Sequence, residues 1–456
     1  MPIKDTIVAL STPPGRSGIG IIRLSGQLSL DIARALIQKP SFVPEPQHVY
    51  LTTIRDPATG DIVDRGLITY FKAPHSFTGE DVIELSCHGS PVLLRNVLDV
   101  VLSLNARLAE PGEFTLRALS HGRLNLSQAE AIRDLINART KAAALQAQRQ
   151  LGGELSRQLQ PLKNILVEVI VPLESALEFV EDDLPEVLID QILSKLSMLG
   201  TRIAQLGDTF KSGRLLRDGL KVVLVGKPNV GKSSVFNELL VQDRAIVTEV
   251  AGTTRDSLSE AISLNGIPIL LTDTAGLRTS EDLIENLGVG RTRTAIADAD
   301  LIVYLIDRSR PITADDLAVF EEVRANPNII ALNKSDLPPF PQSMDAPTSE
   351  QTIAVVNISA KLGTGLDDLR AAIIQPFMSQ DARVDGLLVT DARHFDLLKR
   401  TGDSLRTSEQ LLVERVSEEL VLVGLYDALR YLGEITGETT PDDVLSEIFA
   451  TFCIGK

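Results

Sequence analysis

An apolar run in the middle of the chain, Leu220 to Val225, leads directly into Gly-Lys-Pro-Asn-Val-Gly-Lys-Ser, from Gly226 to Ser233. This is the GxxxxGKS spacing of a phosphate-binding loop, whose glycines let backbone N–H groups turn toward phosphate oxygens. In such a loop Lys232 carries a positive charge to the β and γ phosphates, and Ser233 offers its hydroxyl to Mg²⁺. Because the loop needs a strand before it and a helix after it, the motif predicts an α/β domain built on a parallel sheet.

A second motif follows the predicted strand at residues 267–272, where Asp273-Thr-Ala-Gly276 gives the DxxG pattern. Asp273 is expected to reach Mg²⁺ through water, while the Gly276 amide contacts the γ phosphate. The position after this motif is Leu277, which cannot orient an attacking water. Three nearby acids, Glu281, Asp282 and Glu285, are candidates for that role, and residue chemistry alone does not choose among them.

Two more motifs predict which base is bound. Asn333-Lys-Ser-Asp336 follows a predicted strand at 329–332, and the Asp336 carboxylate can accept two hydrogen bonds from the N–H groups on one edge of guanine. We expect Asn333 and Lys334 to brace the loop and cover the ring. Ser359-Ala360-Lys361, after a predicted strand at 352–358, would add a backbone contact to the guanine oxygen. Four motifs in this order indicate a GTP-hydrolysing enzyme.

Composition limits the remaining possibilities. A chain of 456 residues suggests about three domains. Cys87 and Cys453 lie far apart outside any CxxC pair, which argues against a disulfide framework or a zinc site and favours the reducing cytoplasm. The apolar stretches are too short to span a membrane. A net charge of -16 argues against bulk electrostatic binding of nucleic acid, although 202–221 and 291–293 are either local basic patches or solvated helix faces.

The pattern of apolar residues changes along the chain and predicts a multidomain protein. Residues 1–118 alternate short apolar runs with turn signals, typical of an α+β domain, with helices expected at 28–38 and 91–104. Helical spacing dominates 119–217 and returns in 380–456, including predicted helices at 391–400, 408–432 and 441–450. We therefore predict one discontinuous all-α domain, interrupted by an α/β P-loop (Ras-like) GTPase domain at 218–379.

The phosphate loop and the segment after it carry a resemblance to a known family. Gly226-Lys-Pro-Asn229, together with Thr248 to Asp256, resembles the family that groups the GTPases TrmE, Era and EngA. The resemblance implies that Thr254 joins Ser233 on Mg²⁺. It also implies a K⁺ ion held by Asn229, Thr248, Val250 and Thr253, although from the residues alone Asn229 is equally an ordinary loop residue. The GTP-binding residues expected in full are Asn229, Val230, Gly231, Lys232, Ser233, Ser234, Thr248, Glu249, Val250, Ala251, Gly252, Thr253, Thr254, Asp273, Thr274, Ala275, Gly276, Asn333, Lys334, Asp336, Ser359, Ala360 and Lys361.

The flanking segments resemble one branch of that family. The chain has one set of GTPase motifs, unlike EngA, and no GxxG clamp after residue 380, unlike Era. Its distinctive segments match the tRNA-modifying branch instead: Asp5–Ala9 with Thr12–Arg16, Ser76–Asp81, Pro111–Phe114, Gln128–Ile132 and Phe452–Lys456.

This resemblance implies a particular reaction and particular partners. A member of this branch works with the FAD-containing protein MnmG, in a heterotetramer, to add an aminomethyl or carboxymethylaminomethyl group to carbon 5 of the wobble uridine of tRNA. A tetrahydrofolate derivative, the 5-formyl or 5,10-methylene form, supplies the one-carbon unit, and the N-terminal domain forms the homodimer. The alternative is a switch GTPase that acts in ribosome or ribonucleoprotein assembly without modifying tRNA.

The resemblance also implies roles for individual residues. Arg23, Glu84, Arg123 and Lys456 would contact the folate, although the residues alone favour Arg23 and Glu84 as solvated strand residues of a structural domain. Glu285 would position the attacking water, alongside Lys232 and Asp273 as catalytic groups. Cys453 would have a direct chemical role, and an inert thiol at a buried or frayed terminus is an equal alternative.

Overall fold

The computed structural model describes residues 5–178, 186–243, 259–273, 293–341, 346–377, 386–438, 445, 448–453 and 455. The chain forms two compact units. The first comprises Met1–Arg133, Gln150–Pro161 and Leu429–Lys456, and the second comprises Asp134–Arg149 and Leu162–Ala428. The division into segments 1–118, 119–217, 218–379 and 380–456 stays a prediction.

The first unit contains a six-stranded sheet in the order β3-β4-β5-β2-β1-β6. Neighbouring strands pair antiparallel except β1 and β6, which are parallel. The strands are β1 Thr6–Leu10, β2 Ile19–Ser25, β3 Val49–Arg55, β4 Ile62–Phe71, β5 Val82–His88 and β6 Ala106–Leu108. Because side chains alternate across a strand, each strand of this sheet offers one set to each face.

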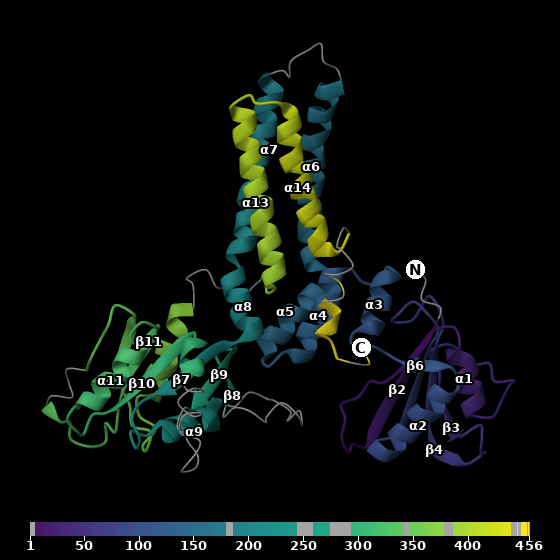
Figure 1. Ribbon diagram of the computed structural model, residues 1–456, viewed down its shortest axis with the longest axis horizontal. Helices are drawn as coiled ribbons and strands as arrows, with labels where there is room; N and C mark the ends of the chain where they lie inside the picture. The colour runs from purple at the N-terminus through teal and green to yellow at the C-terminus, as the bar shows by residue number, and fades with distance from the viewer. Residues whose placement is uncertain are drawn as a thin grey trace. The chain divides into compact units, whose positions relative to one another are not determined.

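Two helices cover one face of this sheet, and both were expected from the sequence. Helix α1 spans Ser29–Leu36 and α2 spans Pro91–Ser103, and their buried side chains pack with Ile22, Leu24 and Leu85 of the strands (Figure 1). Ser90 has the extended backbone of an N-cap, but its hydroxyl makes no capping hydrogen bond. The α+β expectation for this part of the chain is confirmed.

The first unit also joins residues that are distant in sequence. Helix α3 (Glu113–Ser120) packs Phe114 against Ile7 and Ala9 of β1. Phe449 and Phe452, close to the C-terminus, pack against Leu126 and Ala129 at the start of α4 (Leu126–Asn137).

The second unit contains a helical bundle in which α6, α7, α13 and α14 lie side by side (Figure 1). Lys195 of α7 pairs with Glu168 of α6, Ser408 of α13 donates to the Val421 carbonyl of α14, and Tyr426 bonds to Glu174. The helices of this region are α5 Lys141–Leu151, α6 Glu154–Glu178, α7 Glu186–Asp208, α8 Phe210–Asp218, α13 Ala392–Val413 and α14 Glu418–Thr436.

One expectation about these helices is wrong. The helix predicted at 408–432 is broken between α13 and α14, where Arg415 adopts a left-handed φ of 53°. Pro161 and Pro172 both lie inside α6, so neither starts a helix. The buried side chains Leu159, Leu166 and Leu173 offset the backbone hydrogen bonds that the prolines remove. Among the described residues, no helix is long and apolar enough to cross a bilayer.

The second sheet, in the order β12-β11-β10-β7-β9-β8, confirms the expected α/β domain. All neighbouring pairs are parallel except β8 with β9. The strands are β7 Leu220–Val225, β8 Ser259–Leu264, β9 Ile267–Asp273, β10 Leu301–Asp307, β11 Asn328–Asn333 and β12 Thr352–Asn357.

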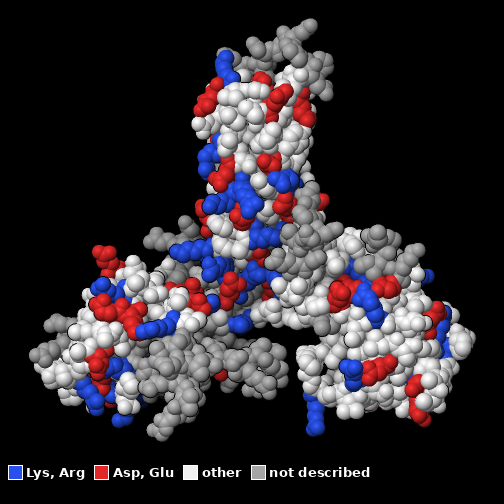
Figure 2. Space-filling model, viewed as in Figure 1, with Lys and Arg blue, Asp and Glu red and all other residues white. Residues whose placement is uncertain are grey.

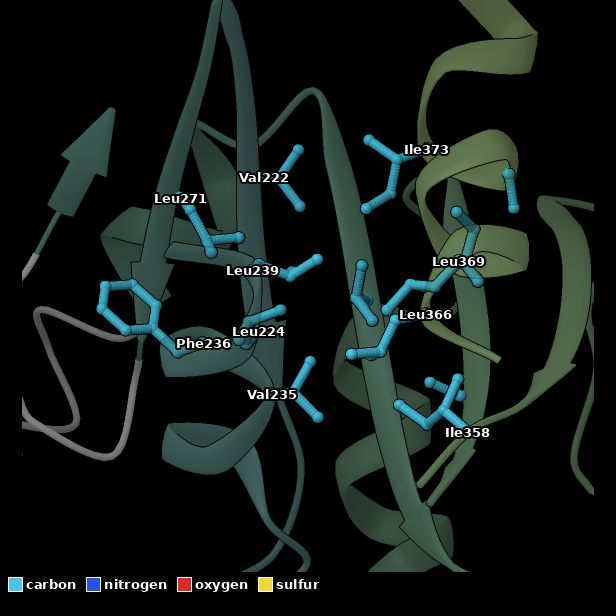
Figure 3. Packing of buried hydrophobic residues seen from close by; sticks show 14 of the residues in the cluster. Val222, Leu224, Val235, Phe236, Leu239, Leu271, Ile358, Leu366, Leu369 and Ile373 are labelled. Carbon is cyan, nitrogen blue, oxygen red and sulfur yellow. The ribbon is translucent and has the colours of Figure 1, made fainter. Parts of the chain in front are cut away.

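Helices cover both faces of this sheet. On one face, α9 (Lys232–Asp243) and α12 (Leu366–Ile374) pack their apolar side chains against the strands, and Figure 3 shows Val235 and Leu239 beside Leu224. On the other face, Phe320 and Val323 of α11 (Ala314–Val323) join a separate cluster. Every strand that precedes a predicted motif, namely β7, β9, β11 and β12, ends at that motif.

Candidate functional site

The phosphate loop lies between the end of β7 at Val225 and the start of α9 at Lys232. Its two glycines have left-handed φ angles, 156° at Gly226 and 99° at Gly231. A Cβ at Gly226 would lie 2.6 Å from the Leu305 carbonyl oxygen, and one at Gly231 would lie 2.3 Å from Nδ2 of Asn333. Both positions therefore require glycine for backbone shape and for space.

Lys232 extends back into this loop and is 7% exposed. Its Nζ donates to the carbonyl oxygens of Gly226 at 2.8 Å and Lys227 at 2.9 Å. The ammonium is therefore held among oxygen acceptors, the same kind of partner that phosphate oxygens would supply. Asn229, at the exposed crest of the loop, has a φ of 64°.

Ser233 and Asp273 meet although they are 40 residues apart. The Ser233 hydroxyl donates to Oδ2 of Asp273 at 2.7 Å, and Asp273 is 5% exposed at the end of β9. A hydroxyl and a carboxylate are hard oxygen ligands of the type that Mg²⁺ prefers, so this pair fits a shared magnesium site. Ser234, the next residue of α9, is exposed.

Asn333 connects three loops of the site. Its Nδ2 donates to the Val230 carbonyl of the phosphate loop at 2.8 Å, and its Oδ1 accepts from the backbone N–H of Ala360 at 3.1 Å. Asn333 is 2% exposed, so these bonds are shielded from water. One buried side chain therefore fixes the phosphate loop relative to both loops predicted to hold the base.

Asp336 and Ser359 form the predicted guanine-selecting corner. The buried Ser359 hydroxyl donates to Oδ1 of Asp336 at 2.7 Å and orients a carboxylate that is exposed to solvent. That hydrogen bond, helped by the nearby charges of Lys361 and Lys334, holds the pKa of Asp336 below its ordinary value. The carboxylate is therefore ionised at neutral pH, which the paired N–H groups of a guanine edge require of their acceptor.

Sequence reasoning did not find Asp307, which holds Lys334. The Lys334 Nζ donates to Oδ2 of Asp307 at 2.6 Å, and Ser309 donates to Oδ1 of the same carboxylate. Burial opposes ionisation of Asp307, but these donors lower its pKa. A sequence signal was present, because Asp307 directly follows an apolar run at 301–306 in the way that Asn333 follows 329–332, and the structure pairs these two strand ends.

Some predicted residues lie outside the described part of the chain. They are Thr248, Glu249, Val250, Ala251, Gly252, Thr253, Thr254, Thr274, Ala275, Gly276, Glu281, Asp282, Glu285 and Lys456. Of the K⁺ ligands expected from the resemblance, only Asn229 is therefore described.

A second cluster of predicted residues lies in the first unit. Arg23 of β2 and Glu84 of β5 are cross-strand neighbours, and Nε and Nη2 of the arginine lie 2.9 and 2.7 Å from Oε1 of Glu84. Nη1 of Arg23 also donates to the Gly455 carbonyl at 3.3 Å, and the guanidinium lies 5.9 Å from the centre of the Phe114 ring. Both charged side chains remain 23% exposed, so the pair is accessible to a ligand.

The C-terminal segment is attached beside this pair. The Ser11 hydroxyl donates to the Gly455 carbonyl at 3.0 Å, and the Gly112 N–H donates to the Cys453 carbonyl at 3.4 Å. Cys453 itself is exposed. Arg123 is also exposed and its side chain lies beside Gly79, in the loop before β5.

Comparison with known proteins shows which family the chain belongs to. A family model described as the GTP-binding protein TrmE N-terminus matches residues 6–123, and one described as the MnmE helical domain matches residues 126–453. The tRNA modification GTPase MnmE of Aquifex aeolicus (strain VF5) is 41% identical over 455 residues, which cover 100% of both chains. The chain belongs to the MnmE family of tRNA modification GTPases.

Other MnmE relatives agree along the full length. The protein from Koribacter versatilis is 40% identical over 459 residues, and that from Geobacter sulfurreducens is 41% identical over 460, each match covering 100% of both chains. Among solved structures, a variant of Aquifex aeolicus Era bound to GDP·AlF4⁻ matches 40% of this chain and 66% of its own at 25% identity, with a TM-score of 0.28. That TM-score adds nothing to the assignment, which the family models and full-length relatives support.

Membership in the MnmE family makes this protein a GTP-binding GTP hydrolase that acts in tRNA modification. It favours that function over a switch GTPase limited to ribosome or ribonucleoprotein assembly. The phosphate loop, the Ser233–Asp273 pair and the Asp336 corner have the residue types and spacing that this activity requires.

Several described basic residues of the two segments singled out from the sequence are paired with acids. Arg217 contacts Asp134 at 3.2 Å and Asp391 at 2.7 Å, and Arg293 lies 3.6 Å from Glu322. Figure 2 shows acidic and basic side chains mixed over the visible surface. These contacts favour solvated and ion-paired faces over a continuous patch for nucleic acid.

Proposed function

We propose that this MnmE-family GTPase acts in the cytoplasm with the FAD-containing protein MnmG, as a heterotetramer, to modify carbon 5 of the wobble uridine in certain tRNAs. The added aminomethyl or carboxymethylaminomethyl group takes its one-carbon unit from a 5-formyl or 5,10-methylene tetrahydrofolate. The observation that carries this proposal is the accessible Arg23–Glu84 pair, with the C-terminal segment bonded to Arg23 through Gly455.

The chemistry of folate suits this cluster. A pterin ring presents adjacent N–H donors, which a carboxylate such as Glu84 can accept in pairs. The glutamate end of folate carries carboxylates, for which Arg23, Arg123 and Lys456 are suitable partners. Gly455 attaches the C-terminal segment here, so Cys453 belongs to the same region as the proposed one-carbon donor.

Titration of 5-formyltetrahydrofolate into the protein tests this site. We expect saturable binding that Glu84→Gln weakens at least about tenfold, since a charged acceptor is replaced by a neutral amide. The matched control is Glu45→Gln, which changes an exposed acid elsewhere in the same unit. GTP turnover should be unchanged in both variants. Absence of binding to the unaltered protein would refute the folate assignment while leaving the GTPase intact.

For the GTPase site we propose that Ser233 and Thr254 ligate Mg²⁺, and that Asn229, Thr248, Val250 and Thr253 ligate K⁺. A cation beside the β and γ phosphates can neutralise the charge that develops in the transition state. Glu285 would then orient the attacking water. Replacing K⁺ with Na⁺ should slow GTP turnover, and equal rates in the two salts would remove the K⁺ site from the proposal.

We further propose that the homodimer forms through the face of the first sheet opposite α1 and α2. Leu51 of β3 and Leu67 of β4 are cross-strand neighbours on that face and are 62% and 38% exposed. Leu51→Glu should convert a dimer to a monomer in light scattering. Val43→Glu, at an exposed apolar residue in the segment between α1 and β3, is the control and should leave the dimer intact.

The product is tested with purified components. The protein, MnmG, tRNA, GTP and the folate donor are incubated together, and the nucleosides of the tRNA are separated and identified by mass spectrometry. We expect a new nucleoside modified at carbon 5 of the wobble uridine, and its loss when MnmG is omitted. An unaltered wobble uridine in the complete mixture would overturn the proposed reaction.

A further inference from the structure

Lys227, the second residue of the phosphate loop, makes a contact that the GTPase motifs do not account for. Its Nζ donates to the Thr313 hydroxyl at 2.6 Å and lies 2.8 Å from Oδ2 of Asp316, at the start of α11. The Lys227 side chain is 25% exposed and that of Asp316 is 7% exposed. The ion pair is therefore largely shielded, and more strongly held than one on an open surface.

The partner of Lys227 is rigidly placed. Asp316 and Thr313 form a capping box, in which Oδ2 of Asp316 accepts from both the backbone N–H and the hydroxyl of Thr313 at 2.8 Å. The carbonyl oxygen of Asp316 accepts from the hydroxyl of Tyr304, a fully buried residue of β10. The first turn of α11 is thus fixed to the core of the sheet and provides a firm anchor.

The loop itself is anchored on both flanks. On one side, the Lys227 carbonyl accepts from the Lys232 ammonium at 2.9 Å, and on the other the Val230 carbonyl accepts from Asn333 at 2.8 Å. Between these anchors lie Pro228 and Asn229, and Asn229 has the left-handed φ that the crest of the loop requires. The Lys227 side chain adds a contact with Asp316 on the first of these flanks, so Lys227 is held there through both its carbonyl and its ammonium.

We propose that Lys227 is a positioning residue of the GTPase, whose ion pair with Asp316 ties the phosphate loop to α11 and keeps the loop in its nucleotide-receiving shape. This rests on the assignment of residues 226–233 as the phosphate loop. Because Asp316 neutralises Lys227, the lysine acts through the loop backbone, and its charge is not directed at the phosphates.

Two single variants distinguish a lysine that positions the loop from a lysine that binds the phosphates directly. Lys227→Met keeps most of the side-chain stem but removes the charge, and Asp316→Asn keeps an acceptor for the capping box but weakens the ion pair. If Lys227 positions the loop, both variants should weaken binding of a fluorescent GDP analogue by roughly fivefold, the size expected for a largely shielded charged contact that acts on the nucleotide indirectly. If Lys227 instead attracted the phosphates directly, Asp316→Asn would tighten binding by releasing that charge.

A double-mutant cycle completes the test. The doubly substituted protein should bind GDP as weakly as each single variant, and Lys227→Arg should bind within about twofold of the unaltered protein, since it retains the ion pair. The increase in KM for GTP should exceed the change in kcat, and the melting temperatures of the free proteins should agree within a few degrees. Tighter binding in Asp316→Asn, or unchanged binding in Lys227→Met, would overturn the proposal. Lys232→Ala is the separate test of the phosphate loop, because its failure to weaken binding would refute that assignment instead.

Discussion

Asn333→Ala is the most informative single change in the nucleotide site, because it removes two buried hydrogen bonds that hold three loops together. Each bond contributes about 1 kcal/mol net, so their loss amounts to about 2 kcal/mol. The carbonyl of Val230 and the N–H of Ala360 are left in buried positions, which raises the total toward about 4 kcal/mol if water does not reach them. A cost of about 2 kcal/mol that falls entirely on the nucleotide-bound state corresponds to a roughly 30-fold loss of affinity.

The assay combines titration of a fluorescent GDP analogue with thermal unfolding of the free protein. Loss of these hydrogen bonds can weaken nucleotide binding, destabilise the free protein, or do both. A destabilised free protein melts at a lower temperature, so the two measurements together give the whole free-energy loss. Asn333→Asp keeps the acceptor for Ala360 but loses the donor to Val230, and should lose affinity as well. Asn357→Ala removes one exposed side chain of the same domain and should change neither measurement strongly. If Asn333→Ala binds GDP within twofold of the unaltered protein at an unchanged melting temperature, the loops do not depend on these bonds.

Three further outcomes are expected. Glu285→Ala should slow GTP hydrolysis about 100-fold or more with nearly unchanged GDP affinity in stopped-flow binding, and a parallel loss of both would indicate misfolding. Gly365→Ala should destabilise the protein by about 1–3 kcal/mol in urea unfolding. The residue has a φ of 73°, and an added Cβ would lie 2.0 Å from the Asn357 carbonyl oxygen. An unchanged free energy of unfolding would mean that the backbone at this position relaxes freely. Burial opposes ionisation of Asp391, yet the charges of His394 and Arg217 lower its pKa to about 2 from 3.8. Ionised Asp391 therefore contributes about 2 kcal/mol to the free energy of unfolding above pH 4, and this contribution is lost as the pH falls toward 2. In Asp391→Asn, the free energy of unfolding should fall less steeply between pH 4 and pH 2.

Much of the α/β domain follows from local sequence. The phosphate loop requires a strand and a helix on its two sides, and β7 and α9 occupy those positions. The strands before Asp273 and Asn333 follow from β-branched runs in the same way. These elements were predictable because propensity, hydrophobic pattern and motif agree.

The pairings between distant residues were not predictable. No periodicity joins Lys227 to Asp316 or His88 to Asp64, whose Nδ1 and Oδ1 atoms lie 2.8 Å apart. Such contacts depend on which loops the topology brings together, and a single sequence carries no signal for that.

The packing of Phe449 and Phe452 against Leu126 and Ala129 also sets an order of events during synthesis. A ribosome makes the first half of this cluster early and the second half only after the whole GTPase domain has emerged. Until then Leu126 and Ala129 leave an apolar surface on α4 exposed in the nascent chain. Chaperones can bind this surface, and it promotes aggregation if translation stalls. Variants that weaken the two phenylalanines should therefore lower the yield of folded protein in cells more than they lower the stability of the molecules that do fold.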